Sequence, residues 1–219
     1  VPYLSILARK YRPRSVRYID PDKLTVENLY RQWGNLDGSD VLGMLKVEAA
    51  LEALSPAMGV ADQGVVAQTF RSDRAGSMEG IVLVVVNVDN HEGRLEVHKW
   101  ASTRQGLTAM VVSGCDGTKG QCLWGLYYNG VPVHDWLALH PDTYDTTPDE
   151  RRGTCGGQTI RSNAITGQMV GICVEEAMEA LRDHPLPCYP NEWYWGRDTH
   201  TGQFRAWNQS VVATSIAER

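Results

Sequence analysis

The stretch GIVLVVVNVDN, residues 80–90, decides the fold class. Its apolar run is almost unbroken, as in a strand that is covered on both faces at the centre of a sheet. The run ends in Asp89 and Asn90, which places a carboxylate and an amide at the strand end where ligands bind in α/β sheets. We therefore expect an α/β protein with Asp89 at its functional edge.

The sequence on both sides of this stretch alternates between strand and helix patterns. Apolar spacing predicts helices over residues 2–11, 41–54, 94–102 and 158–181, strands over 16–20, 65–70, 107–112 and 120–129, a loop over 130–156 and a hairpin over 191–207. This order favours a Rossmann-like fold, in which helices flank a mostly parallel central sheet that carries an antiparallel extension. We expect residues 1–219 to form one domain.

Composition excludes several classes of protein. The formal net charge of −5 disfavours non-specific nucleic-acid binding, which needs basic surface. The longest apolar run, residues 81–86, is too short to cross a bilayer. Five cysteines without a C-x-x-C pair predict neither a disulfide framework nor a four-cysteine zinc site, and they indicate a reducing, cytoplasmic compartment.

The segment IDPDKLTVENLYRQ, residues 19–32, contains the densest group of polar ligand-binding candidates. Asp20 stands at the end of a predicted strand, where a Rossmann-like sheet places the carboxylate that binds a ribose. Asn28, Arg31 and Gln32 follow within about one turn of helix and offer amide and guanidinium donors.

Lys46, on the next predicted helix, adds a second cation to this group. An arginine and a lysine beside a nucleotide pocket neutralise a triphosphate better than a nicotinamide dinucleotide. Asp89 is a candidate Mg²⁺ ligand, because Mg²⁺ binds through few carboxylates together with phosphate oxygens. The sequence therefore predicts a site for a nucleoside triphosphate and Mg²⁺.

The ordered block D-x-D-x-x-x-x-x-N-L-x-R-Q, a downstream lysine and a D-N strand end resemble the ThiF/MoeB family, which includes the adenylation domain of ubiquitin-activating enzymes. The resemblance covers residues 3–205. It implies that the nucleotide is bound by Asp20, Asp22, Asn28, Arg31, Gln32, Lys46 and Asp89. It also implies Mg²⁺ at Asp89 and catalytic roles for Arg31 and Asp89.

The resemblance further implies an activity and partners. Members of the family adenylate the C-terminal carboxylate of a ubiquitin-like or sulfur-carrier protein with ATP, and many then transfer the acyl group to a cysteine. A homodimer and a conjugating enzyme are the further partners expected.

Cys155 is the candidate nucleophile for that transfer. It lies in RRGTCGGQT, residues 151–159, in the region where the family has its reactive cysteine. Amides at the start of the following helix and two adjacent arginines would stabilise a thiolate. The alternatives are a structural thiol at this position and Cys188 as the nucleophile. Cys173 is expected to be a buried packing residue, and Cys115 and Cys122 to be structural.

The sequence departs from the family in two ways. No glycine precedes Gly34, so the family's first strand and glycine-rich loop are not represented. We expect a piece of a longer protein; a loop supplied by another chain and a degenerate family member are the alternatives. The paired C-x-x-C motifs of the zinc-binding members are also missing, which favours a zinc-free bacterial branch.

The sequence disfavours two other functions. A non-catalytic subunit that dimerises with an active partner is disfavoured because the sequence retains Arg31, Lys46, Asp89 and Cys155. A Rossmann dehydrogenase is disfavoured by the missing G-x-G-x-x-G. The six histidines show no metal-ligand spacing and are expected at the surface or in caps. The aromatic residues of 190–207 are expected to pack rather than to recognise a partner.

Overall fold

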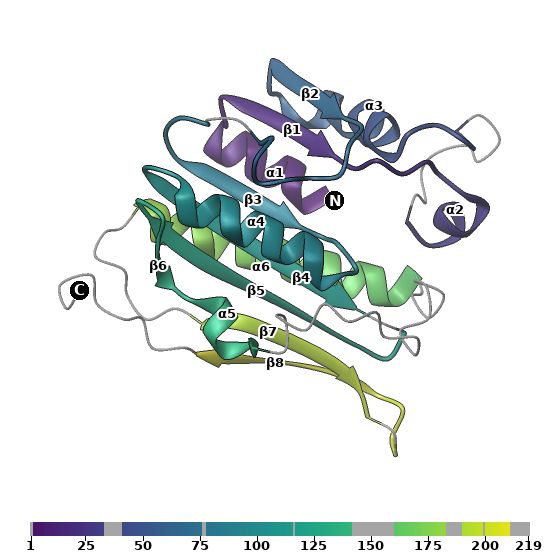
Figure 1. Ribbon diagram of the computed structural model, residues 1–219. Coiled ribbons are helices and arrows are strands. Elements are labelled where there is room, and N and C mark those ends of the chain that lie inside the picture. Colours follow the sequence, from purple (N-terminus) through teal and green to yellow (C-terminus); the bar gives the residue numbers. More distant parts are fainter. Residues whose placement is uncertain are drawn as a thin grey trace.

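The computed structural model describes residues 2–32, 41–75, 78–115, 117–141, 160–182, 190–198 and 200–210 (Figure 1). In chain order the elements are α1 (Pro2–Tyr11), β1 (Ser15–Ile19), α2 (Val26–Gln32), α3 (Lys46–Met58), β2 (Asp62–Val66), β3 (Val82–Val86), α4 (His91–Thr103), β4 (Leu107–Cys115), β5 (Lys119–Tyr128), β6 (Val131–His134), α5 (Trp136–Leu139), α6 (Ile160–Arg182), β7 (Pro190–Arg197) and β8 (Phe204–Ser210). None of these helices is long and apolar enough to cross a membrane.

The strands form two sheets. β1 and β2 pair in parallel as a two-stranded sheet, and the other six form a sheet in the order β3-β4-β5-β7-β8, with β6 paired to β5. Only β3 and β4 are parallel in the larger sheet, and its other pairs are antiparallel. The prediction of a mostly parallel central sheet is therefore wrong for the described strands. Residues 116–118, which join β4 to β5, are too few for the crossover that a parallel connection needs.

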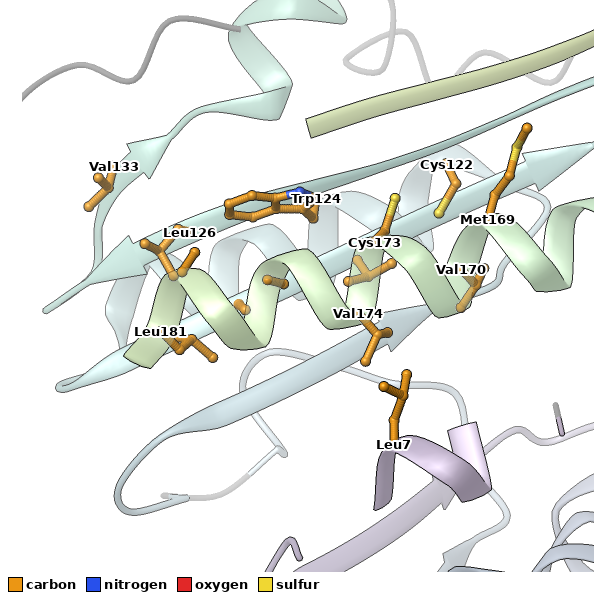
Figure 2. Close-up of a cluster of buried hydrophobic side chains, with 14 of the residues drawn as sticks. Leu7, Cys122, Trp124, Leu126, Val133, Met169, Val170, Cys173, Val174 and Leu181 are labelled. Carbon is orange, nitrogen blue, oxygen red and sulfur yellow. The ribbon is translucent and has the colours of Figure 1, made fainter. Parts of the chain in front are cut away.

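β3 is covered on both faces, as the sequence predicted. Val82 and Val84 pack on the cluster beneath α4, which includes Trp100. Leu83 and Val85 pack on the cluster beneath α6. Figure 2 shows the α6 side, where Cys173 and other α6 residues face the buried residues of β5. Cys173 is fully buried, which confirms its expected packing role.

Helix α1 joins the two sheets. Leu7 packs into the large cluster beneath α6 (Figure 2), whereas Ala8 packs with Met58 and Val60 beside the two-stranded sheet. Lys10 also forms an ion pair with Glu175 of α6. Among the described residues β1 pairs only with β2 and β3 only with β4, so α1 carries much of the connection between the sheets.

The helix predicted over residues 41–54 begins later, at Lys46, for a local reason. The chain just before it pairs with the chain after β1: Leu24 N–H donates to the Met44 carbonyl at 2.8 Å, and Gly43 N–H donates to the Leu24 carbonyl at 3.0 Å. This short extended pairing delays the helix and brings its first residue beside Asp22. The region predicted as a loop over 130–156 contains β6 and α5, and the strand predicted over 65–70 lies earlier, at Asp62–Val66.

Candidate active site at the carboxyl edge

The candidate site lies where β1 and β3 end. Both strands point the same way in Figure 1, so their carboxyl ends face the same side of the molecule. Asp20 directly follows β1, and its N–H donates to the carbonyl of Val66, the last residue of β2, at 3.2 Å. Asp89 follows β3 by three residues. The charge of Asp89 contributes to the raised pKa of Asp20, so the two carboxylates lie within electrostatic range of each other.

Asp20 is half-buried, and its environment disfavours the negative charge. Burial raises the pKa of its carboxyl above the ordinary value, and the charges of Asp22 and Asp89 raise it further. The hydrogen bond from the Asp22 N–H to Asp20 Oδ1, 2.8 Å long, and the charge of Lys46 act in the opposite direction. The Asp20 carboxylate is therefore held by the Asp22 N–H and is influenced by the charges of two other carboxylates.

Lys46 and Asp22 form an ion pair at this edge. Lys46 Nζ lies 2.7 Å from Asp22 Oδ2, and the Lys46 N–H donates to the Asp22 carbonyl at 2.8 Å. A cation at the first residue of a helix is unfavourable, because the positive end of the helix dipole lies there. Such a departure from local preference is characteristic of functional positions.

Asn28 takes part in a helix cap. Its Oδ1 accepts hydrogen bonds from the N–H of Thr25 at 3.0 Å and from the Thr25 hydroxyl at 3.2 Å. The bond from the N–H of Thr25, the residue before α2, to Asn28 Oδ1 is one half of a capping box. Asn28 is buried, so its oxygen is used for structure and its amide nitrogen remains the group for the predicted phosphate contact.

Asp89 lies at the start of α4 and is fixed by its neighbours. Asn90 caps the helix, since its Oδ1 accepts a 2.7 Å hydrogen bond from the Gly93 N–H. Asn90 Nδ2 in turn lies 3.3 Å from Asp89 Oδ1. The Asp89 carboxylate therefore sits at a capped helix start next to the carboxyl edge.

Contacts join Asp20, Asp22 and Lys46, three of the residues predicted for nucleotide binding, and the charge of Asp89 influences the pKa of Asp20. Arg31 and Gln32 lie in the last turn of α2, but their side chains are outside the described part of the chain. Cys155 and Cys188 are also outside the described residues. Their predicted roles stay predictions.

The sequence analysis missed Arg94, in the first turn of α4. Its guanidinium Nη2 donates to the carbonyls of Val88 and Ser113, each at 3.2 Å, so it reaches the ends of both β3 and β4. Its position four residues after the D-N strand end is the signal that could have identified it.

The prediction that all histidines lie at the surface or in caps is wrong. His91 and His134 are buried, and His140 Nε2 lies 2.9 Å from Glu192 Oε1, a carboxylate that is itself buried. The burial and contacts of these histidines depend on tertiary packing, which spacing along the chain does not reveal.

At this edge a metal ion would need additional ligands from a bound nucleotide. Within the described residues, no three histidine, cysteine, aspartate or glutamate side chains are grouped so that they could hold a metal. Mg²⁺ usually binds through one or two carboxylates and completes its shell with phosphate oxygens and water. The exposed Asp89 carboxylate in the turn after β3 therefore fits Mg²⁺ that arrives with a triphosphate.

The fold is similar to that of E. coli MccB. A structure of MccB with ATP superposes with a TM-score of 0.59 and 14% sequence identity, over 98% of this chain and 62% of MccB. A structure of MccB with AMPCPP and MccA gives a TM-score of 0.60 at 14% identity, over 97% of this chain and 61% of MccB. PaaA gives 0.58 at 16% identity, over 94% of this chain and 68% of PaaA.

At these identities the similarity shows the fold alone, and this chain spans about three fifths of MccB. MccB has also been solved with N-formylated MccA and is described as the microcin C7 biosynthetic enzyme. No family model and no curated protein matches the sequence.

Proposed function

We propose that this chain carries the nucleotide-binding edge of an ATP-dependent adenylating enzyme of the ThiF/MoeB type. The observation that carries the proposal is that Asp20 and the Asp22–Lys46 pair are in contact after β1, while Asp89 follows β3, which ends on the same side of the molecule. The similarity in fold to MccB, which is described as the microcin C7 biosynthetic enzyme and has been solved with ATP, supports it.

The proposed roles follow from the chemistry of each side chain. Asp20 accepts hydrogen bonds from the ribose hydroxyls. Lys46 exchanges its bond to Asp22 for the phosphates, and Arg31 adds a second positive charge. Mg²⁺, when bound with the nucleotide at Asp89, supplies positive charge to the phosphate oxygens.

The reaction itself needs positioning and charge neutralisation more than covalent help. A carboxylate oxygen of the acyl substrate attacks the α-phosphorus of ATP. The bond from that phosphorus to the bridging oxygen breaks, and pyrophosphate leaves with the electron pair. The product is an acyl-adenylate. The proposed acyl substrate is the C-terminus of a ubiquitin-like protein.

The second proposed step is transfer to Cys155. Its thiolate attacks the acyl carbon of the adenylate, AMP leaves, and a thioester forms. Cys155→Ala is expected to keep adenylation and to remove a thiol-sensitive acyl-enzyme band on a non-reducing gel. A band that persists in this variant moves the nucleophile to another residue, such as Cys188.

The test of the nucleotide site is binding of AMPCPP with Mg²⁺, measured by titration calorimetry, because it needs no acyl substrate. Asp89→Asn and Arg31→Ala are expected to weaken binding at least tenfold, the loss of about one charged interaction. The matched controls are Asp62→Asn and Arg17→Ala, an exposed ion pair at the opposite end of the β1–β2 sheet. Equal losses in these controls would refute the site.

A second candidate function is a subunit that needs another chain to complete its fold. The supporting observation is that β1 and β3, among the described strands, each pair on one side only, and that Ile81, just before β3, is 60% exposed. Binding of AMPCPP by this chain alone argues for the first function. Binding that requires a candidate partner, with a matching mass by light scattering, argues for the second.

A further inference from the structure

Arg94 forms hydrogen bonds both to the turn after β3, which contains Asp89, and to the neighbouring strand β4. Its Nη2 donates to the carbonyl of Val88, directly before Asp89, and to the carbonyl of Ser113 near the end of β4. The last paired residues of the parallel ladder are Val86 and Val112. The guanidinium therefore links the segment after β3 to β4 beyond the last paired residues of the two strands.

Two glycines make room for this arrangement. A Cβ atom at Gly114 would lie 2.6 Å from Arg94 Nη2, and a Cβ atom at Gly93 would lie 3.1 Å from Val88 Cγ2 and 3.2 Å from Asn90 Oδ1. The turn around Asp89 is thus held from one side by the Asn90 cap and from the other by Arg94. Arg94 holds the backbone carbonyl directly before Asp89, and the residue directly after Asp89 supplies the capping side chain.

We infer that Arg94 is a positioning residue, which fixes the Asp89 carboxylate for Mg²⁺ bound with a nucleotide. This inference rests on the proposed function. The guanidinium's hydrogen bonds go to backbone carbonyls, so its effect on the metal passes through the Val88–Asp89 peptide. Groups that orient a metal ligand in this way typically change metal affinity about 10- to 100-fold when they are lost.

The experiment measures how much Mg²⁺ strengthens the binding of AMPCPP by the whole chain, with calorimetric titrations in the presence and absence of the metal. Arg94→Met is expected to bind metal-free AMPCPP as the wild type does and to lose about tenfold or more of the strengthening by Mg²⁺. Arg94→Lys, which keeps a donor able to reach one carbonyl, is expected to recover part of it.

Gly114→Ala tests the position of the Arg94 guanidinium without removing its charge. The added methyl must displace Arg94 Nη2, the flexible end of a side chain, so the fold is kept while the guanidinium moves. This variant is expected to lose the strengthening by Mg²⁺ although it retains every charge. It also keeps the inference testable if Arg94→Met does not fold.

The control is Arg71→Met. Arg71 is exposed and pairs with Glu92 in the same first turn of α4, so its loss removes one positive charge from the same region. An unchanged effect of Mg²⁺ in folded Arg94→Met or in Gly114→Ala would overturn the inference and leave the nucleotide site intact. A wild-type chain that binds no AMPCPP would instead overturn the proposed function, and the inference with it.

Discussion

The raised pKa of Asp20 predicts that its ionised carboxylate opposes folding at neutral pH. Its folded pKa is raised by burial and by the charges of Asp22 and Asp89. A raised carboxyl pKa means that its stabilising contribution is complete in acid and is lost as the pH rises through that pKa. We therefore expect Asp20→Asn to raise the Tm at pH 7 by a few degrees, while it weakens AMPCPP binding about tenfold.

The measurements are thermal unfolding and calorimetric titration on the same samples. Asn keeps an oxygen that can accept the hydrogen bond of the Asp22 N–H, so only the charge is removed. Asp62→Asn, at the exposed amino end of β2, is the control for a general effect of charge. A lower Tm for Asp20→Asn would show that Lys46 outweighs the repulsion.

His134 is predicted to make stability depend on pH in the opposite direction. It is buried against Trp124, at a ring separation of 4.8 Å, and both of its ring nitrogens lack a hydrogen-bond partner. Burial lowers its pKa from 6.5 to about 4. Because the unfolded chain binds the proton more readily, stability is complete above pH 6.5 and is lost as the pH falls toward 4.

His134→Phe should remove this pH dependence while keeping the ring. The free energy of unfolding of the wild type should fall by up to about 3 kcal/mol more than that of the variant between pH 6.5 and pH 4. Urea unfolding at several pH values measures this difference. His200→Gln, in the exposed β7–β8 turn, should leave the slope unchanged. Parallel slopes for the wild type and His134→Phe would contradict the prediction.

Single residues show where prediction from sequence stops. Asp20 and Asp89 were predicted at strand ends because an acidic residue after an apolar strand marks the ligand edge. The bond of Lys46 to Asp22 depends on the pairing of Leu24 with Met44 and Gly43, which spacing along the chain does not reveal. The burial of His134 depends on the packing of β6 against β5 in the same way.

At the scale of elements, the parallel pair β3–β4 is fastened at both ends by arginines from α4 and its C-cap. Arg94 acts at the carboxyl end, and Arg104 acts at the amino end. Arg104 is buried, and its guanidinium donates to the carbonyls of Met78, Gly80 and Leu107 and to the Thr108 hydroxyl. One side chain therefore satisfies several backbone acceptors where the chain enters β3.

Arg104→Met should destabilise the protein by about 3 kcal/mol, because it leaves three part-buried carbonyls and the buried Thr108 hydroxyl without their donor. Arg104→Lys should recover only a small part, since an ammonium cannot span these acceptors. The measurement is urea unfolding. Arg17→Met, which removes an exposed arginine paired with Asp62, should cost no more than about 1 kcal/mol. Similar losses in both variants would show that Arg104 has no special role.

The kinds of elements were more predictable than their pairing. The helices α1, α4 and α6 and the β7–β8 hairpin lie close to their predicted ranges, because long periodic patterns and turn residues are local signals. The direction of β5 relative to β4 depends on how little chain joins them. That connection is short in the sequence, and its length, more than the strand pattern, determines the antiparallel extension.

At the scale of the whole molecule, the proposed site belongs to neither sheet alone. Asp20 and Lys46 stand at the end of the β1–β2 unit, and Asp89 stands at the end of β3 in the larger sheet. Among the described elements no strand pairing joins the two sheets, and α1 packs on both. A nucleotide bound across the edge would therefore act as a second connection and stabilise both units together.

Hydrogen exchange can detect this connection. Without nucleotide, amides of β1 and β2 should exchange faster than those of β4 and β5, because the smaller sheet packs on small clusters whereas β4 and β5 are buried between α4 and α6. AMPCPP with Mg²⁺ should then slow exchange both after β1, at residues 20–24, and after β3, at residues 87–93. The amino ends of β1 and β3, near Ser15 and Gly80, serve as internal controls, since they lie at the opposite edge. Protection confined to one of the two units would mean that the nucleotide does not bridge them, and the shared site at the carboxyl edge would be wrong.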